Sequence, residues 1–486
     1  MLAQTFRVLT APFRLVPWYG WLAIAAVLAW FGRNFLLIAA TILAFHPIPV
    51  PPIFQGEPET VAEARAQDMR HFRHVRRNER SMDPDMQERF DAAVARLEQA
   101  APDLTDAEFQ LALARVQAVI DNGHSNGSAT RMVQPFDRWP IRTTWMDGEL
   151  RVLRALPEQA DLLGAELTHI NGLPAAEVLL RFRDAFGGVD ASFFTFAPLL
   201  LETPDYLAAI GINTPSLRFR LDDGRLEERQ LGAVPAVAGA ARHYSADFIL
   251  PGRRETDDWL SVLPQGEPLY LQHTDRGYWF EPVPDLDAVY LNLARNYDDD
   301  SGERLVDFIV RAGEEMAALS PSVLILDQRL NGGGDLTITA SLMRRLGEIV
   351  GPRGRIYLLT SGSTFSAGIV NLAMAKEAAP EQTRLVGEPI GDRLQFWAEG
   401  WWFSLPNSGF RARYSTGFYD LQNGCEGLFV CPWGSLHIFP VIVDDLDVDI
   451  AAPLTWQAYQ AGRDPALEAI RAIEASEPQP GPEARP

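Results

Sequence analysis

The sequence predicts a mixed α/β protein whose largest part is a mostly parallel sheet covered by helices. From residue 266 onward, apolar runs such as SVLILDQRL alternate with amphipathic runs such as GERLVDFIVRAGEEMAAL, as in parallel strands that helices bury on both faces. Before that part, residues 140–235 contain short strand patterns bounded by Asn-Gly and Asp-Gly turns, and residues 57–120 contain charged, Ala-rich helical patterns. A helical region and a smaller β module therefore precede the sheet.

Composition limits the classes of function. The chain has 486 residues, 47% of them hydrophobic, which is enough for two or three domains with separate cores. Its formal charge of -21 makes a nucleic-acid backbone an unfavourable partner. The two cysteines, Cys425 and Cys431, are too few for a zinc site. Their spacing leaves open a local disulfide or a pair of reduced thiols.

Residues 1–50 are predicted to form a cytoplasmic tip and a membrane anchor. The run from 17 to 45 carries one charge, Arg33, follows Arg7 and Arg14, and begins and ends with aromatic residues. A hairpin turning at Arg33 is the alternative, but each half would have only about 15 apolar residues against the roughly 20 that a crossing needs. We therefore predict a single-pass anchor in the inner membrane, with the rest of the chain in the periplasm.

Residues 51–138 are predicted to form a small helical region. The Pro-rich spacer HPIPVPPIF leads into helical patterns, and one of them, TDAEFQLALARVQAVI, opens with Thr105 and Glu108 spaced as a capping box. The region ends in DNGHSNGSA, where Asn, Gly and Ser favour a loop that carries His124.

Residues 139–236 change to short strands. LLGAELTHINGLPAAEVLLRF predicts a strand, an Asn-Gly turn and a helix, and SLRFRLDDGRLEERQL predicts a hairpin across Asp-Gly. This order resembles a PDZ domain, which implies a groove where an extended peptide pairs with an edge strand. A structural β module without a ligand is the alternative.

Residues 237–475 are predicted to hold the parallel sheet, and 476–486 a flexible tail. In such sheets, ligands bind beyond the C-terminal ends of the strands. Two loops follow strands there: LDQRLNGGGD, with Gly332, Gly333 and Gly334, and LLTSGSTFSAG. The first lacks the Lys of a phosphate-binding loop, and no dinucleotide fingerprint occurs. The remaining interpretation is a site whose backbone N–H groups bind an oxyanion.

These two blocks resemble the signature blocks of the C-terminal processing and tricorn-type serine peptidases. RLVGEPIGD, FSLPNSGFRARYST and YQAGRDPALEAIRAI follow in the family's order, so the resemblance covers roughly residues 110–475. It implies a ClpP/crotonase-like core, serine peptidase activity on peptides or protein tails, and neither a cofactor nor a metal.

The resemblance places the nucleophile on Ser366 and the oxyanion-binding N–H groups on Ala367 and Gly333. An N–H at the start of a helix carries the positive end of the helix dipole, which suits a developing negative charge. Ser361 and Ser363 stand earlier in the turn, and we interpret them as turn or capping residues.

A lysine base is excluded. Members of the dyad type place a Lys in a G-x-x-T-x-G-K context, where this chain has GEPIGDR, with Asp392 and Arg393. Arginine stays protonated and cannot act as a base. The sequence has a single lysine, Lys376, ten residues after Ser366 on the same predicted helix. At 1.5 Å per residue it lies roughly 15 Å away.

Tricorn-type members instead use a His before the PDZ-like domain, where VIDNGHSNG supplies His124. A neutral imidazole with an ordinary pKa of about 6.5 can take the serine proton at pH 7. His437 is the reserve candidate. The family's third member, a Glu before the final strand, has no match because Pro440 falls near its place. Glu426 and Glu388 therefore remain equal candidates.

The expected function is that of a membrane-anchored serine endopeptidase that forms an acyl-enzyme on Ser366 with His124 as base. The alternative is a non-catalytic homologue that keeps the fold and binds peptide as a scaffold. Two departures motivate this alternative: the unmatched third member and Ile369, where many relatives carry Glu.

Overall fold

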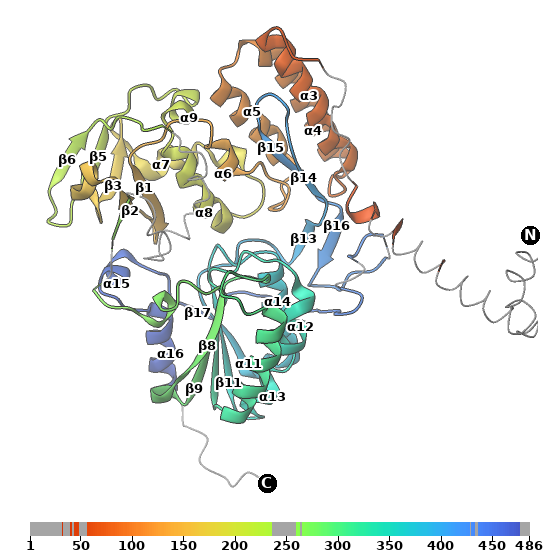
Figure 1. The fold of residues 1–486 in the computed structure, drawn as a ribbon, viewed down its shortest axis with the longest axis vertical. Coiled ribbons are helices and arrows are strands. Elements are labelled where there is room, and N and C mark those ends of the chain that lie inside the picture. Colours follow the sequence, from red (N-terminus) through yellow and green to blue (C-terminus); the bar gives the residue numbers. More distant parts are fainter. Residues whose placement is uncertain are drawn as a thin grey trace, which may run out of the picture.

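The computed structural model describes residues 32, 39–40, 43–47, 56–235, 259–262, 265–427, 429–432 and 436–476. Within these ranges the predicted mixed α/β class is confirmed, with one partly parallel sheet and several antiparallel ones. Figure 1 shows the parallel-sheet core below, an antiparallel module at upper left and a helical region at upper right. The predicted domain boundaries stay predictions, and the predicted tail lies, after Ser476, outside the described residues.

The core sheet has six strands in the order β17-β12-β11-β10-β9-β8. Neighbouring strands run parallel, except that β8 pairs antiparallel with β9. Asp327 lies beside Leu359, and Thr360 beside Gly387, so the loops after β10, β11 and β12 leave from the same edge. The strands are β8 (Tyr278–Val283), β9 (Ala288–Leu293), β10 (Val323–Asp327), β11 (Arg355–Thr360), β12 (Thr383–Gly387) and β17 (Ile450–Ala451).

Helices cover both faces of this sheet because its strands are apolar on both. Leu324 and Leu326 of β10 pack in a cluster with α11 to α14, whereas Val323 and Ile325 pack in another with α16. The helices are α11 (Leu305–Leu319), α12 (Leu336–Met343), α13 (Leu346–Val350), α14 (Ala367–Ala378), α15 (Trp456–Gln460) and α16 (Pro465–Ser476), with the 3-10 turns η5 (Leu269–Leu271), η6 (Pro284–Leu286) and η7 (Pro380–Gln382).

The antiparallel module follows the strand order β1-β2-β3-β5-β6, with β4 paired to β3 and β7 to β2. Strand β1 is an edge strand, and α8 packs against it. The strands are β1 (Ile141–Met146), β2 (Glu149–Ala155), β3 (Glu166–Ile170), β4 (Leu173–Pro174), β5 (Leu217–Arg220), β6 (Leu226–Arg229) and β7 (Leu260–Ser261). The helical elements are η3 (Pro157–Leu162), α7 (Ala175–Leu180), η4 (Arg183–Ala185), α8 (Asp190–Leu201) and α9 (Pro204–Ala209).

Three of the N-terminal helices begin at side-chain caps, one of which the sequence predicts. Thr105 and Glu108 form the predicted capping box, in which each side chain bonds the other's backbone N–H. Thr60 and Asp83 cap the two preceding helices. The elements are α3 (Val61–Asn78), α4 (Pro84–Ala100), η2 (Ala101–Asp103), α5 (Asp106–Ala118) and α6 (Ala129–Met132).

A hairpin from the core belongs physically to this helical region. Strands β14 (Trp401–Ser404) and β15 (Arg411–Tyr414) pair with each other, and β13 (Gln395–Ala398) pairs with β16 (Gly417–Asp420). Phe403 and Phe410 lie in the same buried cluster as residues of α3 and α4. In Figure 1 the blue hairpin rises from the core to the orange helices. The helical region and the core are thus joined by shared apolar packing.

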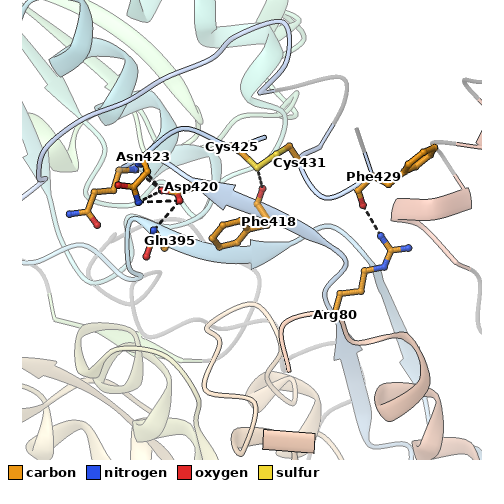
Figure 2. The surroundings of a disulfide bond; sticks show 9 residues. Arg80, Gln395, Phe418, Asp420, Asn423, Cys425, Phe429 and Cys431 are labelled. Carbon is orange, nitrogen blue, oxygen red and sulfur yellow. Dashed lines mark hydrogen bonds between the residues drawn. A yellow bond between two sulfur atoms is a disulfide. The ribbon is translucent and has the colours of Figure 1, made fainter. Parts of the chain in front are cut away.

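Cys425 and Cys431 form a disulfide, which settles the alternative that their spacing left open. Figure 2 shows it beside β16, where Cys425 Sγ lies 3.1 Å from the carbonyl oxygen of Phe418. Phe429 lies in the loop that this disulfide closes, and its carbonyl oxygen accepts a hydrogen bond of 2.9 Å from Arg80 of the helical region. The disulfide loop is therefore tied to both neighbouring parts.

The predicted membrane anchor, and with it the periplasmic location, needs correction. No helix in the described part of the chain is both long and apolar enough to cross a membrane. Most of the run from 17 to 45 lies outside the described residues. At its described end, Phe45 is buried, and its carbonyl oxygen accepts a hydrogen bond of 2.9 Å from Gly400 N–H. The apolar composition of the run therefore does not by itself identify a lipid-facing segment.

Candidate active site

The two signature blocks meet at the C-terminal edge of the core sheet. Phe365 N–H donates a hydrogen bond of 2.9 Å to the carbonyl oxygen of Asn331. A Cβ on Gly333 would lie 2.6 Å from Ser366 Cβ, and one on Gly368 would lie 2.7 Å from the Asn331 carbonyl oxygen. Only glycine permits this approach, since real Cβ atoms do not come so close.

The hydroxyl residues before Ser366 build the turn. Ser361 Oγ donates to the carbonyl oxygen of Arg329 and accepts from Ser363 N–H. Thr364 Oγ1 donates to the carbonyl oxygen of Gln328 at 2.8 Å. These bonds tie the turn to the loop after β10, as expected for turn residues.

Ser366 differs from its neighbours in conformation and in its partners. It occupies the N-cap position of α14 but makes no capping hydrogen bond, and its backbone has φ 54° and ψ -123°. A non-glycine residue at positive φ is strained, and such strain gathers at functional sites. A serine on a strained strand-to-helix turn presents its hydroxyl outward, as in a nucleophile elbow.

Ser366 opens into a cavity of about 340 Å³ that also contains His124. The cavity walls come from both signature blocks, the His124 loop, β13 to β16 and the N-terminal segment. The lining residues are His46, His124, Gly332, Gly334, Leu336, Phe365, Ser366, Ala367, Phe396, Ala398, Glu399, Gly400, Arg413 and Tyr419. The structure thus brings together Ser366, Ala367 and His124 around one space.

His124 is held between two aromatic rings and a carboxylate. Its ring stacks on Phe365 at a centroid distance of 4.3 Å and on Phe396 at 5.0 Å. Its Nδ1 lies 3.2 Å from Oδ2 of Asp392, and both side chains are buried. A carboxylate only accepts hydrogen bonds, so Nδ1 carries the proton and Nε2 is left as the basic nitrogen. Nε2 is buried and, within the described structure, has no hydrogen-bond partner.

Burial lowers the pKa of His124 below its ordinary value, because the charged imidazolium loses its hydration. The hydrogen bond to Asp392 opposes this effect, while the positive charge of Arg413 adds to it. The imidazole is therefore neutral at pH 7, as a general base must be. The expectation that His124 has an ordinary pKa is therefore wrong, because the pKa is lowered. The sequence pattern did not indicate that the ring would be so deeply buried.

The His124 loop is fixed by buried polar contacts. Ser125 Oγ donates a hydrogen bond of 2.7 Å to Glu79, whose pKa is raised by burial. Glu79 also accepts from Ser415 N–H at 2.9 Å. Asn122 Nδ2 donates to Ser125 Oγ at 2.8 Å and to the carbonyl oxygen of Trp397 at 2.9 Å. These bonds join the loop to the residue that follows α3, to strand β13 and to the residue that follows β15.

The GDR segment holds the same loop from the other side. Asp392 contacts His124, and the adjacent Arg393 donates to the carbonyl oxygen of Asp121 at 2.7 Å and to its carboxylate at 2.9 Å. The Asp and Arg that replace the family's lysine thus both bind the loop that carries the histidine.

The oxyanion-binding groups are only partly available. Ala367 N–H is the first of α14, where no intrahelical acceptor exists. Gly333 N–H instead donates a hydrogen bond of 2.9 Å to Oδ1 of Asn331. Gly332 and Gly334 line the cavity on either side of it. The role of Gly333 therefore stays a prediction, and it requires this N–H to leave Asn331.

The remaining candidates lie elsewhere. His437 and Glu426 are exposed. Lys376 donates a hydrogen bond of 2.8 Å to Asp445 from the last turn of α14, so it is engaged away from Ser366. Glu388 lines a second cavity rather than the one that His124 lines, and burial raises its pKa.

Sequence reasoning missed Asp392 as the partner of His124. A signal for it existed, because Asp392 stands in the GEPIGDR segment that aligns with the base of the dyad-type enzymes. Among the described residues, no group of three or more His, Cys, Asp and Glu side chains is arranged to hold a metal ion.

Comparison with known proteins gives a fold. No protein-family model matches the sequence, and no curated protein matches it closely. Mature CPAF complexed with lactacystin is 14% identical, with 85% of this chain and 98% of that chain covered and a TM-score of 0.55. A mutant of CPAF is 13% identical, with 86% of this chain and 99% of that chain covered and a TM-score of 0.55. The tricorn protease is 12% identical over 85% of this chain and 37% of that chain. Its TM-score of 0.35 is too low for a structural comparison.

These neighbours are S41-family serine peptidases. The predicted resemblance is therefore confirmed as a shared fold, and the chain has the architecture of this class of peptidase. At identities of 13–14% the likeness extends to the fold alone. Activity has to be argued from the site.

Proposed function

We propose that the protein is a serine endopeptidase with Ser366 as nucleophile, His124 as general base and Asp392 as the residue that orients His124. The observation that carries the proposal is the buried contact between His124 Nδ1 and Asp392, which leaves Nε2 unprotonated on a residue that lines the same cavity as the strained Ser366. This is the arrangement of roles found in Ser-His-Asp triads.

In the proposed reaction, Ser366 Oγ attacks the scissile carbonyl carbon while Nε2 of His124 takes the hydroxyl proton. The negative charge moves to the carbonyl oxygen and is bound by Ala367 N–H and, once released from Asn331, by Gly333 N–H. When the C–N bond breaks, the imidazolium returns its proton to the leaving amine. Water then attacks the acyl-enzyme with the same base, which releases the new carboxylate and restores Ser366.

Peptides or protein tails are the proposed substrates. A second cavity of about 600 Å³ lies where β1 and α8 of the antiparallel module face the turn before Ser366. Trp145 and Phe194 line it and stack on each other at 4.4 Å. An edge strand beside a helix, as in the PDZ-like interpretation, suits an extended peptide. One N–H of this edge, that of Thr143, is already bound by Glu202.

The alternative, a peptide-binding scaffold without catalysis, rested on the unmatched third member and on Ile369. The contact of Asp392 with His124 supplies such a member and favours the enzyme. A fluorophosphonate probe tests the choice directly: the full chain should be labelled, and Ser366→Ala should not. Labelling that persists in Ser366→Ala, or a wild-type chain that is folded and never labelled, would rule out the proposed mechanism.

A further inference from the structure

A short segment before the first long helix binds beside the Ser366 cavity. Phe45 and Pro47 both offer backbone carbonyl oxygens to the core. Phe45 O accepts from Gly400 N–H at 2.9 Å and from Thr416 Oγ1, and Pro47 O accepts from the Tyr414 hydroxyl. In Figure 1 this short red segment lies next to the base of β14 and β16.

His46 completes the contact. Its Nδ1 lies 3.2 Å from the carbonyl oxygen of Gly400, and since a carbonyl only accepts, Nδ1 is the donor. Its Nε2 lies 3.6 Å from the Glu399 carboxylate. Gly400 therefore contacts this segment with both of its backbone polar groups: its N–H donates to the Phe45 carbonyl oxygen, and its C=O accepts from the His46 ring. We call Glu399, Gly400, Tyr414 and Thr416 the ledge.

The ledge is shaped for a backbone. Gly400 has φ +75°, and a Cβ there would overlap the carbonyl oxygen of Tyr414. The contacts use mainly main-chain oxygens of the bound segment, so recognition depends little on its sequence. The side chain of Phe45 does contribute to recognition. Phe45 is only 4% exposed, so it supplies a buried apolar anchor.

The ledge and the nucleophile share one cavity. His46, Glu399 and Gly400 line the same space of about 340 Å³ as Ser366 and His124. An extended chain that lies along the ledge therefore enters the space in front of Ser366. While residues 45–47 are bound, that path is taken by the protein's own backbone.

We propose that the ledge is a binding surface for an extended peptide with a large apolar side chain, and that Phe45–Pro47 is its resident occupant, which an incoming peptide must displace. The identification of that incoming peptide as a substrate rests on the proposed function. The charged groups that face the occupant are Glu399, at the His46 ring, and Arg413, which donates to the Glu399 carbonyl oxygen at 3.1 Å.

Competition by a tethered segment lowers the apparent affinity in proportion to the fraction of free ledge. A tether also holds its segment at a high local concentration. Weakening the resident segment should therefore strengthen the binding of an added peptide. If the ledge is about 90% occupied, full release gives a gain of about tenfold.

The test measures binding without catalysis. A fluorescent peptide of sequence LAFHP, that of residues 43–47, is titrated into the full chain carrying Ser366→Ala, and fluorescence polarisation is recorded. Adding Phe45→Ala and His46→Ala should tighten binding about tenfold or more. Leu43→Ala is the matched control, because Leu43 is 62% exposed and should leave the affinity unchanged. A peptide with Ala in place of Phe should bind much more weakly.

Equal affinities for the wild-type and the doubly substituted segment would overturn the proposal, as would no binding to either. Since Phe45 is buried, His46→Ala alone serves as a second variant; its side chain is 39% exposed, so loss of the fold is not expected, and affinity should still rise. In the active chain the same variants should lower KM at constant kcat. If the peptide binds as expected but no chain that retains Ser366 reacts with a fluorophosphonate, the proposed catalysis is wrong. The proposal that the ledge binds an extended peptide is then retained.

Discussion

Nδ1 of His124 lies 3.2 Å from Oδ2 of Asp392, although the two residues are 268 positions apart in the chain. The contact joins a loop after α5 to the loop after β12, and both side chains are buried. Because it fixes the tautomer of the imidazole, it determines which nitrogen can act on Ser366.

Asp392→Asn should reduce kcat/KM by about 10³–10⁴-fold, since an amide can stabilise the wrong tautomer and cannot balance the imidazolium. Circular dichroism should show an unchanged fold. Glu388→Gln is the comparison variant, because Glu388 is the other carboxyl candidate from the sequence and lines the second cavity; it should reduce kcat/KM far less than Asp392→Asn does. If the two variants behave in the opposite way, Glu388 is the orienting residue.

The pH dependence follows from the lowered pKa of His124. Lowering the pKa keeps the base neutral at pH values where an ordinary imidazole is already protonated. The acidic limb of the kcat/KM profile should therefore have its midpoint below about 6.5. The measurement is a profile from pH 4 upward, restricted to the range in which the protein stays folded. A midpoint at or above the ordinary value would contradict the buried position of the ring.

Gly333→Ala should lower the free energy of unfolding by about 2 kcal/mol or more, because the residue has φ +101° and its new Cβ would press on Ser366. Gly332→Ala is the control, since a Cβ there meets no heavy atom within 4 Å. Urea unfolding compares the two. Similar midpoints for both variants would show that the glycine block can shift away from the serine.

Replacing Cys425 and Cys431 together with Ser should lower the free energy of unfolding by about 2 kcal/mol, the loop-closure value for so short a loop. The same loss should appear when the wild-type protein is unfolded under reducing conditions. Catalysis should weaken as well, because Tyr419 of the adjacent β16 lines the active-site cavity. Identical unfolding curves with and without reductant would argue against a structural disulfide.

Lys376→Ala should leave kcat/KM unchanged and cost at most about 1 kcal/mol of stability, since it removes one partly exposed ion pair. The pKa of Asp445, which the hydrogen bond from Lys376 lowers, should rise towards its usual value. Assays of the variant beside His124→Ala complete the comparison. An inactive but folded Lys376→Ala protein would refute the histidine mechanism.

The sequence predicted those features that depend on local patterns and on the spacing of residues. Alternating apolar strands and amphipathic helices predicted the fold class, and the resemblance to the processing peptidases placed the candidate nucleophile on Ser366 in the strand-to-helix turn. The partner of His124 could not be read in this way, because many carboxylates are available and only the folded chain selects one. The apolar run at 17–45 misled for a related reason, since composition does not say whether a segment faces lipid or protein. The contact between Phe45 and Gly400 is visible only in three dimensions.

Two features affect folding during synthesis on the ribosome. They are the packing of the β14–β15 hairpin and the distance along the chain between His124 and Asp392. The N-terminal helices leave the ribosome without Phe403 and Phe410, which complete their core. During synthesis at about 5–20 residues per second, the 268 residues that separate His124 from Asp392 take roughly 13–54 s. A nascent chain therefore carries its histidine long before the orienting carboxylate exists. Under the proposed mechanism, the site of Ser366, His124 and Asp392 can therefore assemble only after residue 392 has left the ribosome.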